Sequence, residues 1–201
     1  MSSIEIYQGS ILDVEADAIV NPANSFLRHG GGLAAIIDRA AKVWPHRSGV
    51  DLQASTIDNE FRAQRQAIEQ YENDTLNHAL IPTGGAGWTS AGSLPYKGII
   101  HAVGPIWGGG NYFESQLLIS AYHNAFRVAR NHRCEHVAAP AISAGIFGVP
   151  IHIVSHCAYE VARTTSLRIT FALMDEEHVR AFEAQPEMYD SLYAHKPFRS
   201  E

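Results

Sequence analysis

Short runs of β-branched and apolar residues alternate along this chain with longer segments in which apolar residues recur every three or four positions. The short runs, typical of strands, cover residues 4–8, 16–21, 79–82, 98–103, 136–142 and 168–173. Helical spacing covers 33–44, 117–129, 151–161 and roughly 176–193, and a polar, glutamine-rich stretch over 55–71 predicts a surface helix. Strands separated by helices predict a largely parallel sheet covered on both faces, within one domain over residues 1–201.

Composition narrows the classes of partner. The chain has 201 residues, of which 46% are hydrophobic and 18% charged, as expected for a globular domain. The net charge of −6 argues against duplex nucleic acid, whose binders carry a basic face, but not against a small anion held by backbone amides. No apolar stretch reaches transmembrane length and no secretory signal opens the sequence, so we expect a cytoplasmic monomer without membrane contact.

Two glycine-rich loops each lead from a predicted strand into a predicted helix. The first spans 21–32 and ends in three consecutive glycines, and the second spans 140–150 around Phe147. Glycines let the backbone approach a ligand closely, and a helix N-terminus directs free N–H groups at an anion. One such loop is read as a tight turn, whereas two in equivalent places predict a diphosphate site. The sequence has neither a GxxxxGK[ST] nor a GxGxxG motif, which disfavours a P-loop NTPase and a Rossmann dehydrogenase.

Three ordered motifs resemble those of the macrodomain family, over nearly the whole chain. They are GSI at 9–11 with DAIVNPAN at 17–24 and GGG at 30–32, then TGGAGWT at 83–89 with IHAVGP at 100–105, and finally ISAGIFG at 142–148. The resemblance implies a three-layer α/β/α sandwich with a mixed, mostly parallel sheet and ADP-ribose in a cleft, with no further cofactor.

The resemblance also implies roles for individual residues. Asn24 would bond the distal ribose, Phe147 would cover it, and Ser10 and Ile11 would face the adenine. The glycine loop and residues 143–147 would cradle the diphosphate. The ligand-binding residues implied in this way are Ser10, Ile11, Asn21, Asn24, Gly30, Gly31, Gly32, Leu33, Ser143, Ala144, Gly145, Ile146 and Phe147. The candidate catalytic residues are Asn24, Gly32 and Asp38.

The sequence departs from the family pattern in a few places. Ser10 stands where the family has an aspartate that accepts a hydrogen bond from the adenine amino group, and a neutral acceptor gives a weaker bond than a charged one. Ala34 and Asp38 stand where MacroD-like hydrolases have an aspartate and, one helical turn later, a histidine. Asp38 is a weaker candidate than a substrate phosphate for activating the water, because it lies one turn into the predicted helix. Residues 53–77 match nothing in the family and predict a surface insertion, with a specificity rim as the alternative.

Histidines and cysteines offer alternative chemistry. His152 and His156 are four residues apart on a predicted helix, but no glutamate completes an HExxH pattern, so we expect no metal site. His101, in a predicted strand, is read as a core histidine. Cys134 and Cys157 are read as inert buried thiols in a reducing compartment. The aromatic residues around Gly108–Gly110 are read as packing on a surface loop, with a mobile flap as the alternative.

The sequence leaves three functions open. We expect hydrolysis of mono-ADP-ribosyl esters on acidic side chains of modified proteins, with water attacking the anomeric carbon of the distal ribose. A substrate phosphate would orient that water, since position 34 carries no aspartate. The alternatives are a non-catalytic reader of ADP-ribosylated proteins and an O-acetyl-ADP-ribose deacetylase.

Overall fold

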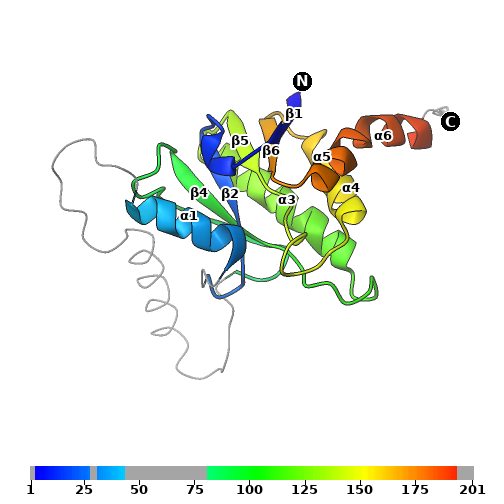
Figure 1. Cartoon of the computed structure of the whole chain (residues 1–201), viewed down its shortest axis with the longest axis horizontal. Helices are drawn as coiled ribbons and strands as arrows, with labels where there is room; N and C mark the ends of the chain where they lie inside the picture. The colour runs from blue at the N-terminus through cyan, green and yellow to red at the C-terminus, as the bar shows by residue number, and fades with distance from the viewer. Residues whose placement is uncertain (1–2, 28–30, 44–80, 194–201) are drawn as a thin grey trace.

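Six strands form one sheet in the order β1-β6-β5-β2-β4-β3 (Figure 1). The computed structural model describes residues 3–27, 31–43 and 81–193. The strands are β1 (Ser3–Gln8), β2 (Ala18–Ala23), β3 (Ala86–Thr89), β4 (Gly98–Val103), β5 (His136–Ala139) and β6 (Arg168–Leu173). Every neighbouring pair runs parallel except β3 and β4. The predicted mixed, mostly parallel sheet is confirmed.

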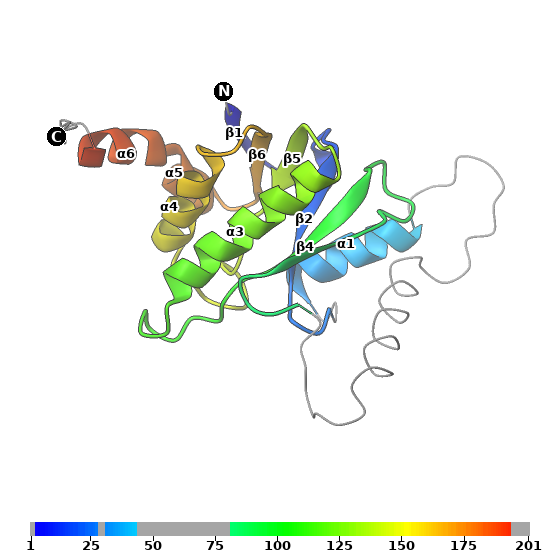
Figure 2. The ribbon, with the colours of Figure 1, turned by 180° about the vertical axis from the view of Figure 1, so that it is seen from behind.

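Helices cover both faces of this sheet. They are the short η1 (Ile11–Asp13), then α1 (Gly32–Val43), α3 (Glu114–Asn131), α4 (Ile151–Ala162), α5 (Glu176–Glu183) and α6 (Gln185–Tyr193). The two opposite views place α1 on one face and α3 with α4 on the other (Figures 1 and 2). Within the described ranges, no helix combines the length and apolar character needed to span a bilayer.

Alternate residues of the central strands divide between two cores. Val20 and Ile100 pack with the buried side chains of α3 and α4, whereas their neighbours Ile19 and Ile99 pack with Ile37 of α1. This division follows from the two-residue period of a strand, and it explains why the sequences of the central strands are mostly apolar. The three-layer arrangement expected from the resemblance is therefore present.

Several predicted boundaries differ from the structure. Of the run 79–82, residues 81–82 lie outside any strand, residues 79–80 lie outside the described ranges, and so does the predicted helix 55–71. Strand β3 was missed because its sequence, AGWT, lies in a glycine-rich stretch. Strand β5 ends at Ala139, before Pro140. The predicted last helix is two helices, because Pro186 has no N–H to donate to the preceding turn.

Strand β2 parts from β5 at the carboxyl end of the sheet. It pairs with β4 from Ala18 to Ala23, but with β5 only at Ala18 and Ile19. The chain leaves β2 toward α1 on one face and leaves β5 toward α4 on the other. In open α/β sheets, such a reversal of connections leaves a crevice at the carboxyl ends of the strands. The fold thus predicts a ligand site between the ends of β2 and β5.

The amino ends of β2, β4 and β5 are joined by Asp17. Its Oδ2 accepts hydrogen bonds from the N–H groups of Glu135 (2.6 Å) and His136 (3.1 Å), and its Oδ1 lies 2.8 Å from Lys97 Nζ. Desolvation raises the pKa of this carboxyl, but the hydrogen bonds from Lys97, Glu135 and His136 outweigh it and lower the pKa to about 2. The ionised Asp17 carboxylate therefore links three strands at the end of the sheet opposite the crevice.

Candidate ligand-binding site

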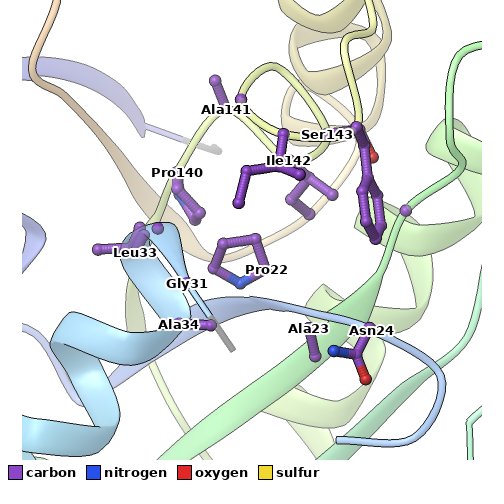
Figure 3. A pocket seen from close by; sticks show the side chains of 15 residues that line it. Pro22, Ala23, Asn24, Gly31, Leu33, Ala34, Pro140, Ala141, Ile142 and Ser143 are labelled. Atoms are coloured by element: carbon purple, nitrogen blue, oxygen red, sulfur yellow. The ribbon is translucent and has the colours of Figure 1, made fainter. Parts of the chain in front are cut away.

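A cavity of about 370 Å³ lies where β2 and β5 diverge. Figure 3 shows residues from the end of β2, the start of α1 and the segment after β5 around one hollow. Its lining comprises Pro22, Ala23, Asn24, Gly31, Gly32, Leu33, Ala34, Gly104, Pro140, Ala141, Ile142, Ser143, Gly145, Ile146 and Phe147. The volume lies within the range of small-molecule sites. Its described lining is mostly apolar and includes two polar side chains, those of Asn24 and Ser143.

The first turn of α1 supplies N–H groups to this cavity. The first residues of an α-helix have no carbonyl partner for their N–H groups within the helix. Here those residues include Gly32, Leu33 and Ala34, which all line the cavity, and their N–H groups donate to no other described residue. Gly32 has a φ of +57°, a left-handed conformation that glycine adopts at little cost. The positive end of the α1 dipole therefore faces the cavity and favours an anion there.

The loop after β5 supplies a second set of N–H groups. Hydrogen bonds from Gly148 N–H to the Gly145 carbonyl (2.9 Å) and from Val149 N–H to the Ser143 carbonyl (3.0 Å) fold it into a compact turn. The N–H groups of Gly145, Ile146 and Phe147 donate to no other described residue. Two sets of donors from separate segments thus border one cavity, as the two glycine loops predicted.

Ile146 extends from the second loop toward the first. Its side chain is 82% exposed, although its Cδ1 lies 3.5 Å from the point where a Cβ on Gly31 would stand and 3.6 Å from the corresponding point on Gly32. A side chain on either glycine would therefore contact Ile146 and narrow the passage between the loops. The glycines keep this passage open.

Asn24 lies at the end of β2 with its amide held in one orientation. Its Oδ1 accepts a hydrogen bond from the Phe26 N–H at 3.1 Å, and its carbonyl accepts from the Leu27 N–H at 2.9 Å. This local turn fixes the side chain beside the cavity, where Figure 3 shows it next to Ala23. Asn24 is thus positioned to bond a hydroxyl of a ligand.

Ser143 is a strained residue in the cavity wall. Its φ of +67° is unusual for a residue other than glycine, and its buried Oγ has no hydrogen-bond partner among the described residues. A Cβ on Gly104 would lie 2.1 Å from that Oγ, so glycine at position 104 is needed to admit the hydroxyl. A left-handed backbone costs ~1–2 kcal/mol. Strain and an unpartnered polar atom at one position are typical of functional sites.

Other predicted site residues do not line the cavity. Ser10 Oγ accepts a hydrogen bond from the Leu12 N–H at 3.2 Å and caps η1, and Ile11 is buried in the core on the α1 side of the sheet. Asp38 and Ala144 are also outside the lining, and Gly30 lies outside the described residues. Ligand contacts by these residues, and a catalytic role for Asp38, remain predictions.

Asn21 is fully buried and takes part in a network beneath the cavity. Its Nδ2 lies 2.9 Å from His101 Nδ1, and His101 Nε2 lies 2.9 Å from Thr89 Oγ1. The Thr89 hydroxyl donates to the Ser90 carbonyl, so it accepts from His101 Nε2–H, and Nδ1 is left to accept from Asn21. This pairing confirms His101 as a core histidine. Asn21 therefore supports the end of β2 and does not line the cavity.

The individual site residues predicted from the sequence leave out seven lining residues, although five of these lie in the two predicted loops at 21–32 and 140–150. The seven are Pro22, Ala23, Ala34, Gly104, Pro140, Ala141 and Ile142. The Gly-Pro pair at 104–105, directly after a buried strand, was the available signal for Gly104. The others are small or apolar residues whose role depends on what lies opposite them.

The cysteines are buried, as predicted. Burial raises the pKa of Cys134 above its usual value and raises that of Cys157 to about 11, so both are thiols at neutral pH. His156 lies near Glu160 on the surface of α4. Across the described ranges, no group of three or more histidine, cysteine, aspartate or glutamate side chains is arranged to hold a metal ion.

The family model of the Macro domain matches residues 45–158. A Citrobacter rodentium protein named O-acetyl-ADP-ribose deacetylase is 36% identical over 188 residues, which cover 90% of this chain and 94% of that protein. An uncharacterised Thermotoga maritima protein is also 36% identical, over 90% of this chain, but this chain spans only 28% of its length.

Solved structures share the fold. The Oceanobacillus iheyensis macrodomain with ADP is 26% identical with a TM-score of 0.73, and the match covers 94% of this chain and 92% of that chain. A variant of that macrodomain with ADPR is 25% identical with a TM-score of 0.72, over 94% of this chain and 95% of that chain.

Proposed function

Because this chain belongs to the macrodomain family, we propose that its cavity binds ADP-ribose and that the protein hydrolyses an ester carried by the distal ribose. The observation that carries the proposal is that two sets of backbone N–H groups border one cavity. One set comes from the start of α1 and the other from residues 145–147. A diphosphate has two anionic groups to match two sets of donors, and backbone donors need no lysine or arginine.

The remaining parts of ADP-ribose have proposed positions around the cavity. The distal ribose would lie toward Asn24 and Phe147, which supply a fixed amide and an aromatic ring to the cavity lining. The adenine would extend along the sheet toward Ser10 and Ile11, beyond the lining described above. The two Oceanobacillus iheyensis macrodomain structures, one with ADP and one with ADPR, support this choice of ligand.

The proposed reaction removes an acidic side chain from the distal ribose. Water attacks the anomeric carbon, the bond from that carbon to the ester oxygen breaks, and the products are ADP-ribose and a free carboxylic acid. Asn24 would hold a ribose hydroxyl, and the N–H groups around Gly32 would hold the diphosphate close to the attacking water. Positioning and exclusion of bulk water would then supply most of the rate.

A second candidate is hydrolysis of O-acetyl-ADP-ribose, which the name of the Citrobacter relative favours. In that reaction water attacks the acetyl carbonyl and the ribose oxygen leaves. Both substrates are esters on the distal ribose and would use the same cavity. A reader without turnover is the remaining alternative, and a time course of ADP-ribose release from an automodified ADP-ribosyltransferase separates it from a hydrolase.

Substitution of Asn24 tests the catalytic assignment. We expect Asn24→Ala to lower turnover of an aspartyl- or glutamyl-ADP-ribose substrate at least ~10-fold, or ~1.4 kcal/mol in activation free energy. Calorimetry should show a smaller loss in affinity for free ADP-ribose, because the two sets of N–H groups still hold the diphosphate.

Asp38→Ala is the matched test of the competing base. If a substrate phosphate orients the water, the turnover rate of the Asp38→Ala variant should stay within a few-fold of the wild type. Loss of a general base would instead lower that rate roughly 10²–10⁴-fold. A collapse in rate with folding and binding intact would make Asp38 the base. No ADP-ribose binding by the wild type would contradict the whole proposal.

A further inference from the structure

Three large apolar side chains project into solvent from the loop between β4 and α3. Ile106 and Tyr112 are each 70% exposed and Phe113 is 73% exposed. We call these three residues the apolar rim. Scattered exposed apolar residues are common on protein surfaces, but three within eight positions of one loop are an unusual concentration.

The loop that carries the apolar rim is held firmly by Glu114. This carboxylate is buried and accepts hydrogen bonds from the N–H groups of Gly108 (2.9 Å), Gly110 (3.1 Å) and Tyr112 (2.7 Å). Phe113, at the N-terminus of α3, has a φ of +60°, an uncommon conformation for an aromatic residue. The fold therefore presents these side chains outward on a fixed backbone, so binding to them would need little ordering.

The loop that carries the apolar rim adjoins the cavity at its Phe147 side. The Trp107 N–H donates to the Phe147 carbonyl at 2.8 Å, which joins the two loops directly, and Gly104 at the start of the rim loop lines the cavity. Figures 1 and 2 both place the loop between β4 and α3 at the same end of the molecule as the loop after β2. Under the proposed function, a group attached to the distal ribose would leave the cavity at this side.

The chemistry of the rim loop favours a polypeptide over a nucleic acid. Residues 104–113 read GPIWGGGNYF and contain no lysine or arginine. Binding of a nucleic-acid backbone depends on cations that neutralise phosphates, whereas peptide recognition uses exposed aromatic and aliphatic side chains. An acetyl group is too small to span from the distal ribose to three separate side chains.

We propose that the apolar rim is a contact surface for the polypeptide that carries the ADP-ribose, with that chain lying across Ile106, Tyr112 and Phe113. This inference rests on the proposed function and adds to it a second binding surface outside the cavity. The ADP-ribose group provides the anchor in the cavity, and the rim adds affinity for the flanking chain.

The test compares two ligands on the triple variant Ile106→Ser, Tyr112→Ser and Phe113→Asn. Asparagine is chosen at position 113 because it tolerates a positive φ. We expect affinity for free ADP-ribose to stay within twofold of the wild type, and KM for a mono-ADP-ribosylated protein to rise at least ~10-fold, as for loss of a central apolar contact. Met188→Ser is the control, since Met188 is also exposed but lies on α6 at the other end of the molecule (Figure 1).

Each contrary outcome has its own meaning. An unchanged KM for the modified protein, with ADP-ribose binding intact, would overturn the rim proposal alone. An equal rise in KM for O-acetyl-ADP-ribose or for an ADP-ribosylated oligonucleotide would overturn the assignment of the apolar rim to polypeptides. Failure of the wild type to bind ADP-ribose would instead contradict the proposed function, and the rim proposal with it.

Discussion

The two ends of the central sheet differ in whether their polar groups have hydrogen-bond partners. At the amino ends of β2, β4 and β5, the carboxylate of Asp17 is paired with Lys97 and with two backbone N–H groups. At the carboxyl ends of the same strands, the Ser143 hydroxyl is buried with no partner among the described residues, and its backbone is left-handed. The same three strands thus have a fully hydrogen-bonded carboxylate at one end and a buried hydroxyl without a described partner at the other.

This contrast separates stability from function along one set of strands. Hydrogen bonds to a charged group contribute about 1.5–3 kcal/mol, whereas a buried polar group without a partner costs about 1–3 kcal/mol. Donors left over at the carboxyl end become useful when an anionic ligand accepts their hydrogen bonds. We therefore expect substitutions at the amino end to change unfolding and substitutions at the carboxyl end to change binding.

The largest expected effect is at Gly145. A Cβ there would meet no atom within 4 Å and its φ is not left-handed, so the fold should accept a larger residue. We expect Gly145→Val to place its methyl groups where the diphosphate would lie and to weaken ADP-ribose binding at least ~100-fold, or ~2.7 kcal/mol. Calorimetry measures the loss, and urea unfolding should show little change. Gly145→Ala, with one methyl group, should lose less affinity, and an equal loss would argue against a steric cause.

The next effect is at the other end of the sheet. We expect Asp17→Ala to lower the free energy of unfolding by about 2 kcal/mol, because it removes a charged acceptor from two backbone N–H groups and from Lys97. Urea denaturation measures this change. ADP-ribose affinity should be unaffected, since the two sites share no partners. A large loss of affinity would show that the two ends are coupled.

The Asp17 carboxyl also predicts how stability depends on pH. Its pKa is lowered from 3.8 to about 2 in the folded protein, so its contribution is present above pH 3.8 and is lost as pH falls toward 2. The wild type should therefore lose more stability than Asp17→Ala between these values. Parallel curves for the two proteins would contradict the assignment.

The smallest effect should be at Ser143 and should have opposite signs for folding and binding. Ser143→Gly removes a strained backbone and an unpartnered hydroxyl, so we expect the free energy of unfolding to rise by ~1 kcal/mol after the entropic cost of glycine. ADP-ribose affinity should fall a few-fold. Ser143→Ala keeps the strained backbone and removes only the hydroxyl, so it measures the effect of the hydroxyl alone. A destabilised Ser143→Gly protein would show that the hydroxyl has a structural partner.

Much of the fold followed from local pattern. Strands β4 and β6 were predicted to the residue, because buried strands of a parallel sheet are continuous apolar runs bounded by polar or turn residues. The anion-binding character of both loops also followed locally, since glycines and a helix start carry their unpaired N–H groups whatever surrounds them. Strand β3 did not, because its place depends on pairing with β4.

Only the tertiary structure decided which polar residues reach the cavity. Asn21 and Asn24 are three positions apart in one motif, yet Asn21 is buried against His101 and Asn24 lines the cavity. Sequence motifs fix neither contact, because both depend on where β4 lies and where β2 leaves β5. Likewise, nothing local places the Ser143 hydroxyl against Gly104 or joins Trp107 to Phe147. These contacts connect segments far apart in the chain, and only the packing of the sheet brings them together.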